Sequence, residues 1–116
     1  MSTVKRFVIV FRTNLPLDVI AAAVAPALEA AFRERDSSFY GGQYFLAGEA
    51  MKEEIRIYRN YDPGEDSPIY QDAPDWPVVM DFSRTCRDSS DMARRIQEML
   101  AVEYRIIRGH ERLGEG

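Results

Sequence analysis

Residues 61–77, YDPGEDSPIYQDAPDWP, decide how this chain is organised, because this long irregular segment separates two runs of regular pattern. It holds four prolines and a glycine. Proline lacks a backbone donor and fixes φ, while glycine permits tight turns, so regular secondary structure is excluded here. Connections beyond about 12 residues are uncommon in compact domains unless they are functional or disordered. Because aromatic and aliphatic residues lie among the acids, we expect an exposed, ordered loop that docks on another molecule.

Before this loop, the pattern predicts a strand, a helix and two further strands. Residues 4–12, VKRFVIVFR, are typical of a strand buried on both faces. Apolar residues recur every four positions from Ile20 to Phe32, which predicts a helix that Pro26 should kink or restart. Residues 33–36 are charged and indicate a solvated helix end. Residues 38–47 and 52–60 then predict two strands that pair as a hairpin.

After the loop, the pattern predicts a strand, a helix and a last strand. Residues 78–83, VVMDFS, form the strand, and Asp88, Ser89 or Ser90 should cap the helix that follows. Residues 104–108 predict a short strand, and residues 110–116 a frayed tail. We therefore expect residues 1–116 to form a single α+β domain in the order βαβββαβ. Its mainly antiparallel sheet should have about five strands with two helices on one face, as a variant of the ferredoxin-like arrangement.

Negative charge is concentrated in the loop. The chain has 15 Lys and Arg against 19 Asp and Glu, a net charge of −4. Because the loop alone contributes −5, the remaining chain carries only +1. Such a patch repels phosphate backbones and attracts basic partners, so we expect a basic protein partner and no nucleic acid. The N-terminal apolar run spans only residues 7–11. A secretory signal needs about 7 to 15 apolar residues and a membrane span about 20, so we expect a cytoplasmic protein without a membrane partner.

Side chains with catalytic or metal-binding chemistry are few. One cysteine and one histidine exclude an internal disulfide and leave too few ligands for structural zinc. Cys86 precedes a helix start, which can lower a thiol pKa, but Asp88 and Asp91 oppose a thiolate there. His110 lies in the predicted tail, without the held geometry that a general base needs. The sequence contains no phosphate-binding glycine loop, GxSxG or HExxH motif, so we expect neither metal nor cofactor.

A pocket is the alternative site. Asp81 lies within a predicted strand, where aspartate is unfavourable, so it should pair across the sheet with Arg12, Arg56 or Arg59. Gly41 and Gly42 indicate a bulge or a close backbone approach. Under this alternative, the chain is a small-ligand-binding or catalytic α+β domain with its pocket near Gly41, Gly42 and Asp81. A third alternative is a purely structural subunit, which predicts an apolar patch away from the loop that stays buried in an oligomer. A homodimer is left open as a partner.

Aromatic residues gather around the loop, and such residues often anchor protein interfaces. This combination of a short chain, an acidic aromatic loop and no catalytic set resembles the small acidic immunity proteins that neutralise bacterial toxins. The resemblance implies a non-enzymatic inhibitor that occludes a basic partner such as a nuclease. It implies charged contacts from the loop acids and anchors from two aromatic residues, namely Asp62, Glu65, Asp66, Asp72 and Asp75, with Tyr70 and Trp76.

Overall fold

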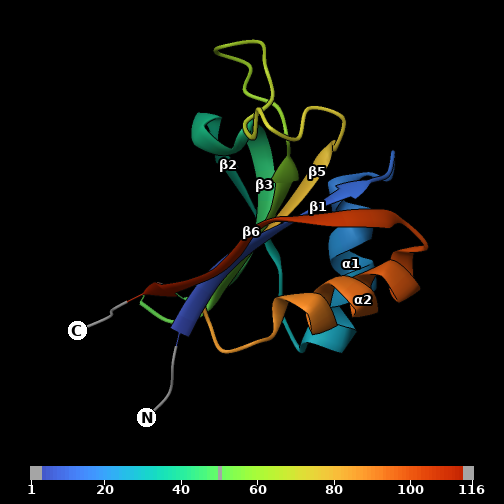
Figure 1. Cartoon of the computed structure of the whole chain (residues 1–116). Coiled ribbons are helices and arrows are strands. Elements are labelled where there is room, and N and C mark those ends of the chain that lie inside the picture. Colours follow the sequence, from blue (N-terminus) through green and yellow to red (C-terminus); the bar gives the residue numbers. More distant parts are fainter. Residues whose placement is uncertain (1–3, 50, 114–116) are drawn as a thin grey trace.

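A six-stranded antiparallel sheet forms the centre of the structure (Figure 1). This computed structural model describes residues 4–49 and 51–113, with the backbone alone at residue 38 and residues 108–113. In sheet order the strands are β2 (Arg33–Ser37), β3 (Gly42–Gly48), β4 (Glu54–Arg59), β5 (Val78–Thr85), β1 (Val4–Arg12) and β6 (Glu103–Leu113). Helices α1 (Leu17–Leu28) and α2 (Ser89–Leu100) pack on one face. The predicted α+β class is confirmed, with six strands where about five were expected.

Strand β1 lies between β5 and β6 and is buried on both faces, as its sequence predicts. Alternate side chains point in opposite directions along a strand. Phe7 and Ile9 join the large cluster beneath the helices, whereas Val8 and Val10 join a second cluster on the opposite side. The sheet therefore has a helix-covered face and a loop-covered face, and the second of these is closed by part of the segment 61–77.

Helix α1 ends earlier than its apolar pattern predicts. Pro26 lies in its last turn, and the helix stops at Leu28, after which Glu29 adopts a left-handed φ of 50°. Because proline has no N–H, Pro26 cannot donate to the carbonyl oxygen four residues earlier, a loss confined to the end of the helix. The left-handed Glu29 then ends α1, and its N–H donates to the Pro26 carbonyl oxygen at 3.2 Å. Residues 29–32 lead into β2 where a second helix was an alternative, and Phe32 packs against the helix-side cluster. None of the helices in the described ranges is long and apolar enough to cross a membrane.

Strand β2 is the element absent from the sequence prediction, which assigned residues 33–36 to a helix end. It pairs antiparallel with β3 along its whole length, and four of its five residues are exposed. Charged residues are common on edge strands because they discourage pairing with other chains. A short turn, η1 (Ser38–Tyr40), connects β2 to β3, and β3 pairs with β4 as the predicted hairpin.

The C-terminal elements agree with the sequence at α2 and extend beyond it at β6. Asp88 caps α2, and its carboxylate accepts the N–H of Asp91 at 2.9 Å. The backbone of β6 runs to Leu113 and pairs with β1 as far as Val4, so the part of the expected tail up to Leu113 is strand. Residues 114–116 of that predicted tail lie outside the described residues.

Candidate functional site

The segment 61–77 folds into two parts with different surroundings (Figure 1). Residues 61–67, called the tip below, project beyond the end of the sheet between β4 and β5. Residues 68–77, called the cover, lie back against the loop-covered face. The acidic loop predicted from the sequence thus consists of one protruding segment and one packed segment.

Short-range hydrogen bonds hold the tip in one turn. Its backbone closes through the Asp62 N–H, which donates to the Ser67 carbonyl oxygen at 2.7 Å. The Asp62 carboxylate accepts the Gly64 N–H at 2.9 Å, and the Asp66 carboxylate accepts the Tyr61 hydroxyl at 2.6 Å. This last bond raises the pKa of the Tyr61 phenol, because ionisation would remove the shared proton and oppose two negative charges. Hydrogen bonds therefore hold two of the three tip carboxylates, those of Asp62 and Asp66, on a closed turn.

The buried side chain of Asn60 holds the cover to the end of β4. Its amide nitrogen donates to the carbonyl oxygens of Ala73 at 2.8 Å and Trp76 at 3.0 Å, and its oxygen accepts the Tyr70 N–H at 2.7 Å. A buried backbone group without a partner costs about 1–3 kcal/mol, so these bonds select one path for the cover. No sequence pattern singles out Asn60, because only the folded loop brings its three hydrogen-bond partners to it.

Tyr70 and Trp76, the expected partner anchors, are partly buried against the sheet. The Tyr70 hydroxyl lies 3.2 Å from the Tyr58 hydroxyl, and the guanidinium of Arg12 lies 4.3 Å from the Trp76 ring centroid. The buried cluster beneath them consists of Val8, Val10, Tyr44, Leu46, Tyr58, Ala73 and Val79. In this structure both aromatic side chains hold the cover on the sheet.

Asp81 lies in a buried polar network on the same face and is only 1% exposed. Its carboxylate pairs with Arg6 at 3.0 Å and accepts the Tyr58 hydroxyl at 3.3 Å. The partner is thus Arg6 of β1, where the sequence offered Arg12, Arg56 or Arg59. Its hydrogen bond with Asp81 raises the pKa of Arg6, while burial and the nearby Asp81 raise the pKa of Tyr58. The Arg6–Asp81 ion pair is therefore structural: it holds the Tyr58 hydroxyl, which in turn lies next to the Tyr70 hydroxyl of the cover.

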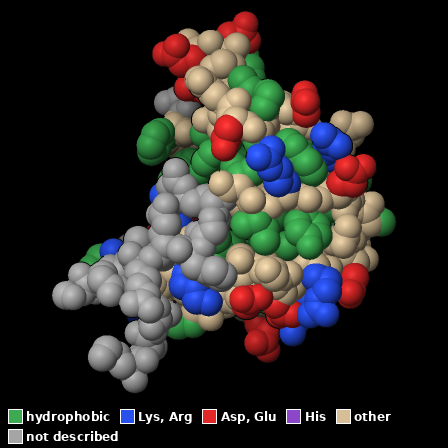
Figure 2. All heavy atoms as spheres, viewed as in Figure 1, with side chains coloured by type: hydrophobic (Ala, Val, Ile, Leu, Met, Phe, Trp, Pro, Cys, Tyr) green, Lys and Arg blue, Asp and Glu red, His purple; other side chains and the backbone are tan. Residues whose placement is uncertain are grey.

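The five loop carboxylates differ in their electrostatic surroundings. Arg105 of β6 donates to the Asp72 carbonyl oxygen at 3.5 Å, and Arg12 reaches the ring of Trp76, so cations border the cover. In the ranges that the structure describes, no Lys or Arg pairs with a tip carboxylate. Figure 2 shows acidic side chains at the end of the projection above the sheet. The described Lys and Arg side chains form no ion pair with Asp72 or Asp75 either, but two of them contact the cover. The tip, with Asp62, Glu65 and Asp66, differs in having no such contact among the described residues.

A rigid acidic turn of this kind suits recognition of cations more than chemistry on a substrate. No protein-family model, curated protein or solved structure matches this chain.

The described residues include no group of three or more His, Cys, Asp and Glu side chains that could hold a metal ion. Cys86 is exposed as a free thiol, and the His110 side chain lies outside the described residues.

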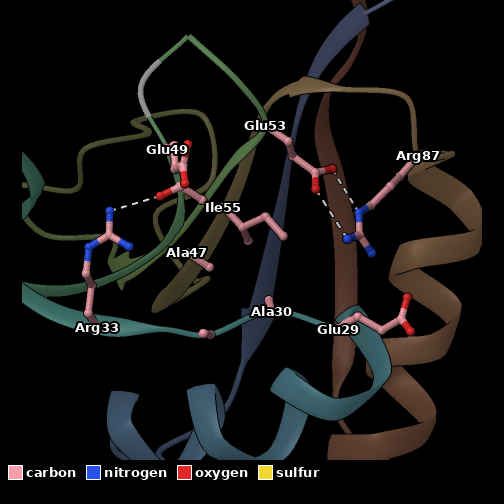
Figure 3. A pocket seen from close by; sticks show the side chains of 10 residues that line it. Glu29, Ala30, Arg33, Ala47, Glu49, Glu53, Ile55 and Arg87 are labelled. Atoms are coloured by element: carbon pink, nitrogen blue, oxygen red, sulfur yellow. Dashed lines mark hydrogen bonds and ion pairs between the residues drawn. The ribbon is translucent and has the colours of Figure 1, made fainter.

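A cavity of about 290 Å³ lies on the helix-covered face, at the end of the sheet away from the tip (Figure 3). Glu53 and Arg87 form an ion pair across one side of it at 2.8 Å, and Arg87 also donates to the Leu28 carbonyl oxygen. Arg33 on the other side donates to the Gly48 carbonyl oxygen at 2.9 Å. The floor is apolar and contains Ala30, Ala47 and Ile55. These contacts tie the end of α1 to the β3–β4 turn and to the start of α2.

The residues expected to line a pocket lie elsewhere. A second cavity, of about 250 Å³, runs beside α1, and neither cavity is lined by Gly41, Gly42 or Asp81. Gly41 has a φ of 77°, and a Cβ there would lie 2.5 Å from the Tyr61 carbonyl oxygen. This glycine therefore permits the close backbone approach that the sequence predicted, and the approaching group is the base of the tip.

The charged edge strand β2 limits one way in which this chain could form the homodimer that the sequence leaves open. In a symmetric antiparallel pair of β2 strands, residues that face each other have numbers of the same parity, because backbone groups facing the partner alternate along a strand. Arg33 and Arg35 would then face only odd-numbered residues, and Glu34 and Asp36 only even-numbered ones. Like charges would oppose each other in every register that overlaps these residues, which is destabilising. Self-association through this edge is therefore disfavoured.

Proposed function

We propose that this chain is a non-enzymatic protein-binding module whose acidic tip docks on a basic partner. The observation that carries the proposal is a hydrogen-bonded turn beyond the sheet that bears three carboxylates, none of which forms an ion pair with a described Lys or Arg side chain. Complementary charge of this kind raises association rates and selects basic surfaces. Because the turn is already ordered, little conformational entropy is lost on binding.

An inhibitor or immunity protein would use such a projection to occlude a cationic active site. The tip extends beyond the end of the sheet, so it can enter a concave surface that the sheet itself would not reach. The cover keeps the base of the projection in place through Asn60. In this mode the partner loses access to its substrate, and the chain needs no reacting group of its own.

The function is tested by selection from a random peptide library displayed on phage. The wild-type chain is compared with a tip-neutral variant carrying Asp62→Asn, Glu65→Gln and Asp66→Asn. These substitutions keep a side-chain acceptor for the Gly64 N–H and the Tyr61 hydroxyl, so the turn should persist. A matched variant, Glu29→Gln with Glu34→Gln and Glu98→Gln, changes the net charge equally at other exposed positions.

Peptides retained by the wild-type chain should be enriched in Lys and Arg. We expect them to associate about tenfold more slowly with the tip-neutral variant and at an unchanged rate with the matched variant. Selection without a basic preference would contradict the proposal. Equal losses in the two neutralised variants would also contradict it, since net charge alone would then explain the binding.

For the fold, we propose that β4, β5, β1 and β6 with the two helices form a ferredoxin-like unit. In this unit β5 and β6 flank β1, and α2 connects them. The hairpin of β2 and β3 then extends one edge of the sheet. A solved structure with this strand order and a right-handed β5–α2–β6 crossover would support the assignment.

A further inference from the structure

The most exposed large aromatic side chain in the described residues lies beside the tip. Phe39 of η1 is 78% exposed, and Tyr61 at the base of the tip is 44% exposed. Their segments meet where Gly41 packs against the Tyr61 carbonyl oxygen. Figure 1 shows η1 next to the base of the projection. An apolar ring and an acidic turn therefore belong to one end of the molecule.

The turn that carries Phe39 is held by the residues around it. The Phe39 N–H donates to the Ser37 hydroxyl at 3.2 Å. The neighbouring ring of Tyr40 lies 4.8 Å from Tyr44 and 5.0 Å from Tyr58, centroid to centroid. The Arg56 guanidinium also lies 5.3 Å from the Tyr40 ring centroid. Tyr40 thus fixes the turn in the loop-side cluster, while Phe39 remains outside it.

A fixed, exposed aromatic ring is a feature of binding surfaces. Rigid aromatic side chains supply a large contact area at a small cost in conformational entropy, and they dominate many interfaces. Phe39 lacks a polar group, so its natural complement is an apolar pocket. The adjacent carboxylates of the tip require cations at the border of that pocket.

We infer that Phe39 is the apolar anchor of the tip's binding surface, and that the partner is a basic protein with an apolar pocket bordered by Lys or Arg. This inference rests on the proposed function. Phe39 takes the place of Tyr70 and Trp76 as the expected anchor, because those two side chains pack against the sheet. The tip then sets the rate and selectivity of association, and Phe39 sets the lifetime of the complex.

The test compares two synthetic peptides of equal charge. The first, acetyl-Lys-Arg-Leu-Trp-Arg-Lys-amide, carries apolar residues between its cations, and the second replaces them to give acetyl-Lys-Arg-Gly-Ser-Arg-Lys-amide. Their affinities are measured by calorimetry on the wild-type chain, on Phe39→Ala and on Met51→Ala. Met51 is a matched control, because it is 79% exposed but lies in the β3–β4 turn, at the other end of the sheet.

The wild-type chain should bind the apolar peptide about tenfold more tightly than the polar one. Phe39→Ala should abolish this preference, Phe39→Leu should retain part of it, and Met51→Ala should keep it. If both peptides bind equally and Phe39→Ala has no effect, the anchor is refuted while the proposed function stands. If tip-neutral substitutions leave the binding of both peptides unchanged, the proposed function fails and this inference fails with it.

Discussion

Replacing Asn60 by alanine should destabilise the whole domain, because one side chain joins β4 to the cover. The substitution removes three hydrogen bonds, to the carbonyl oxygens of Ala73 and Trp76 and to the N–H of Tyr70. At about 1 kcal/mol for each lost bond, the free energy of unfolding should fall by about 3 kcal/mol. A domain of this size has an unfolding entropy of about 0.24 kcal/mol/K, so the melting temperature should fall by about 12 °C.

Urea unfolding measures this effect through two independent signals. Trp76 is the only tryptophan and lies in the cover, so its fluorescence reports the loop, while circular dichroism reports the sheet and helices. Both midpoints should fall together, because an open cover exposes the apolar side chains of Val8, Val10 and Val79.

Asn14→Ala provides the matched control. Asn14 is the other asparagine of the chain and is exposed, so its replacement should change stability by less than about 0.5 kcal/mol. If Asn60→Ala lowers the free energy of unfolding no more than Asn14→Ala does, the three hydrogen bonds of Asn60 do not stabilise the domain. A fluorescence transition far ahead of the dichroism transition would show instead that the cover is an independent unit.

Further substitutions test the base of the tip and the buried network. Gly41→Ala should lower the unfolding free energy by at least about 2 kcal/mol more than Gly42→Ala, because both glycines have positive φ but only a Cβ at Gly41 meets the Tyr61 carbonyl oxygen. Equal costs, measured by urea unfolding, would argue against that contact. Burial and Asp81 raise the pKa of Tyr58, so above about pH 10 the folded state retains a proton that the unfolded state loses, and stability falls as pH rises. Tyr58→Phe should reduce this fall by about 1.4 kcal/mol per pH unit, and an unchanged slope would show that Tyr58 ionises normally in the folded chain.

Local patterns in the sequence are sufficient to predict several elements of the fold. The apolar run of β1 predicts burial on both faces, and the short oxygen-bearing side chains before α2 predict its cap at Asp88. Prolines predict the irregular loop. Strand β2 was not predictable in this way, because four successive charged residues carry no alternation of apolar and polar positions. Its structure depends on β3, which supplies the backbone partners.

The candidate site required tertiary information for a different reason. The acids of the tip and the cover look equivalent in the sequence. Only the fold brings Arg105 to the cover, whereas none of the described Lys and Arg side chains pairs with a tip carboxylate. Similarly, the partner of Asp81 depends on the β1–β5 register, which pairs Asp81 with Val8 and so places Arg6 diagonally opposite. Phe39 does not stand out in the sequence, because the pattern of residues 38–47 predicts a single strand and aromatic residues are common in strands.

Mapping one complex by NMR shows whether the tip is the site for a basic partner. Acetyl-Lys-Arg-Leu-Trp-Arg-Lys-amide is added to the ¹⁵N-labelled chain, and changes in the backbone amide signals are assigned. We expect the largest changes at residues 61–67 and 39–41. This expectation would be contradicted if they lay instead around the cavity beside the β3–β4 turn, where Glu29, Glu49 and Glu53 offer the competing carboxylates.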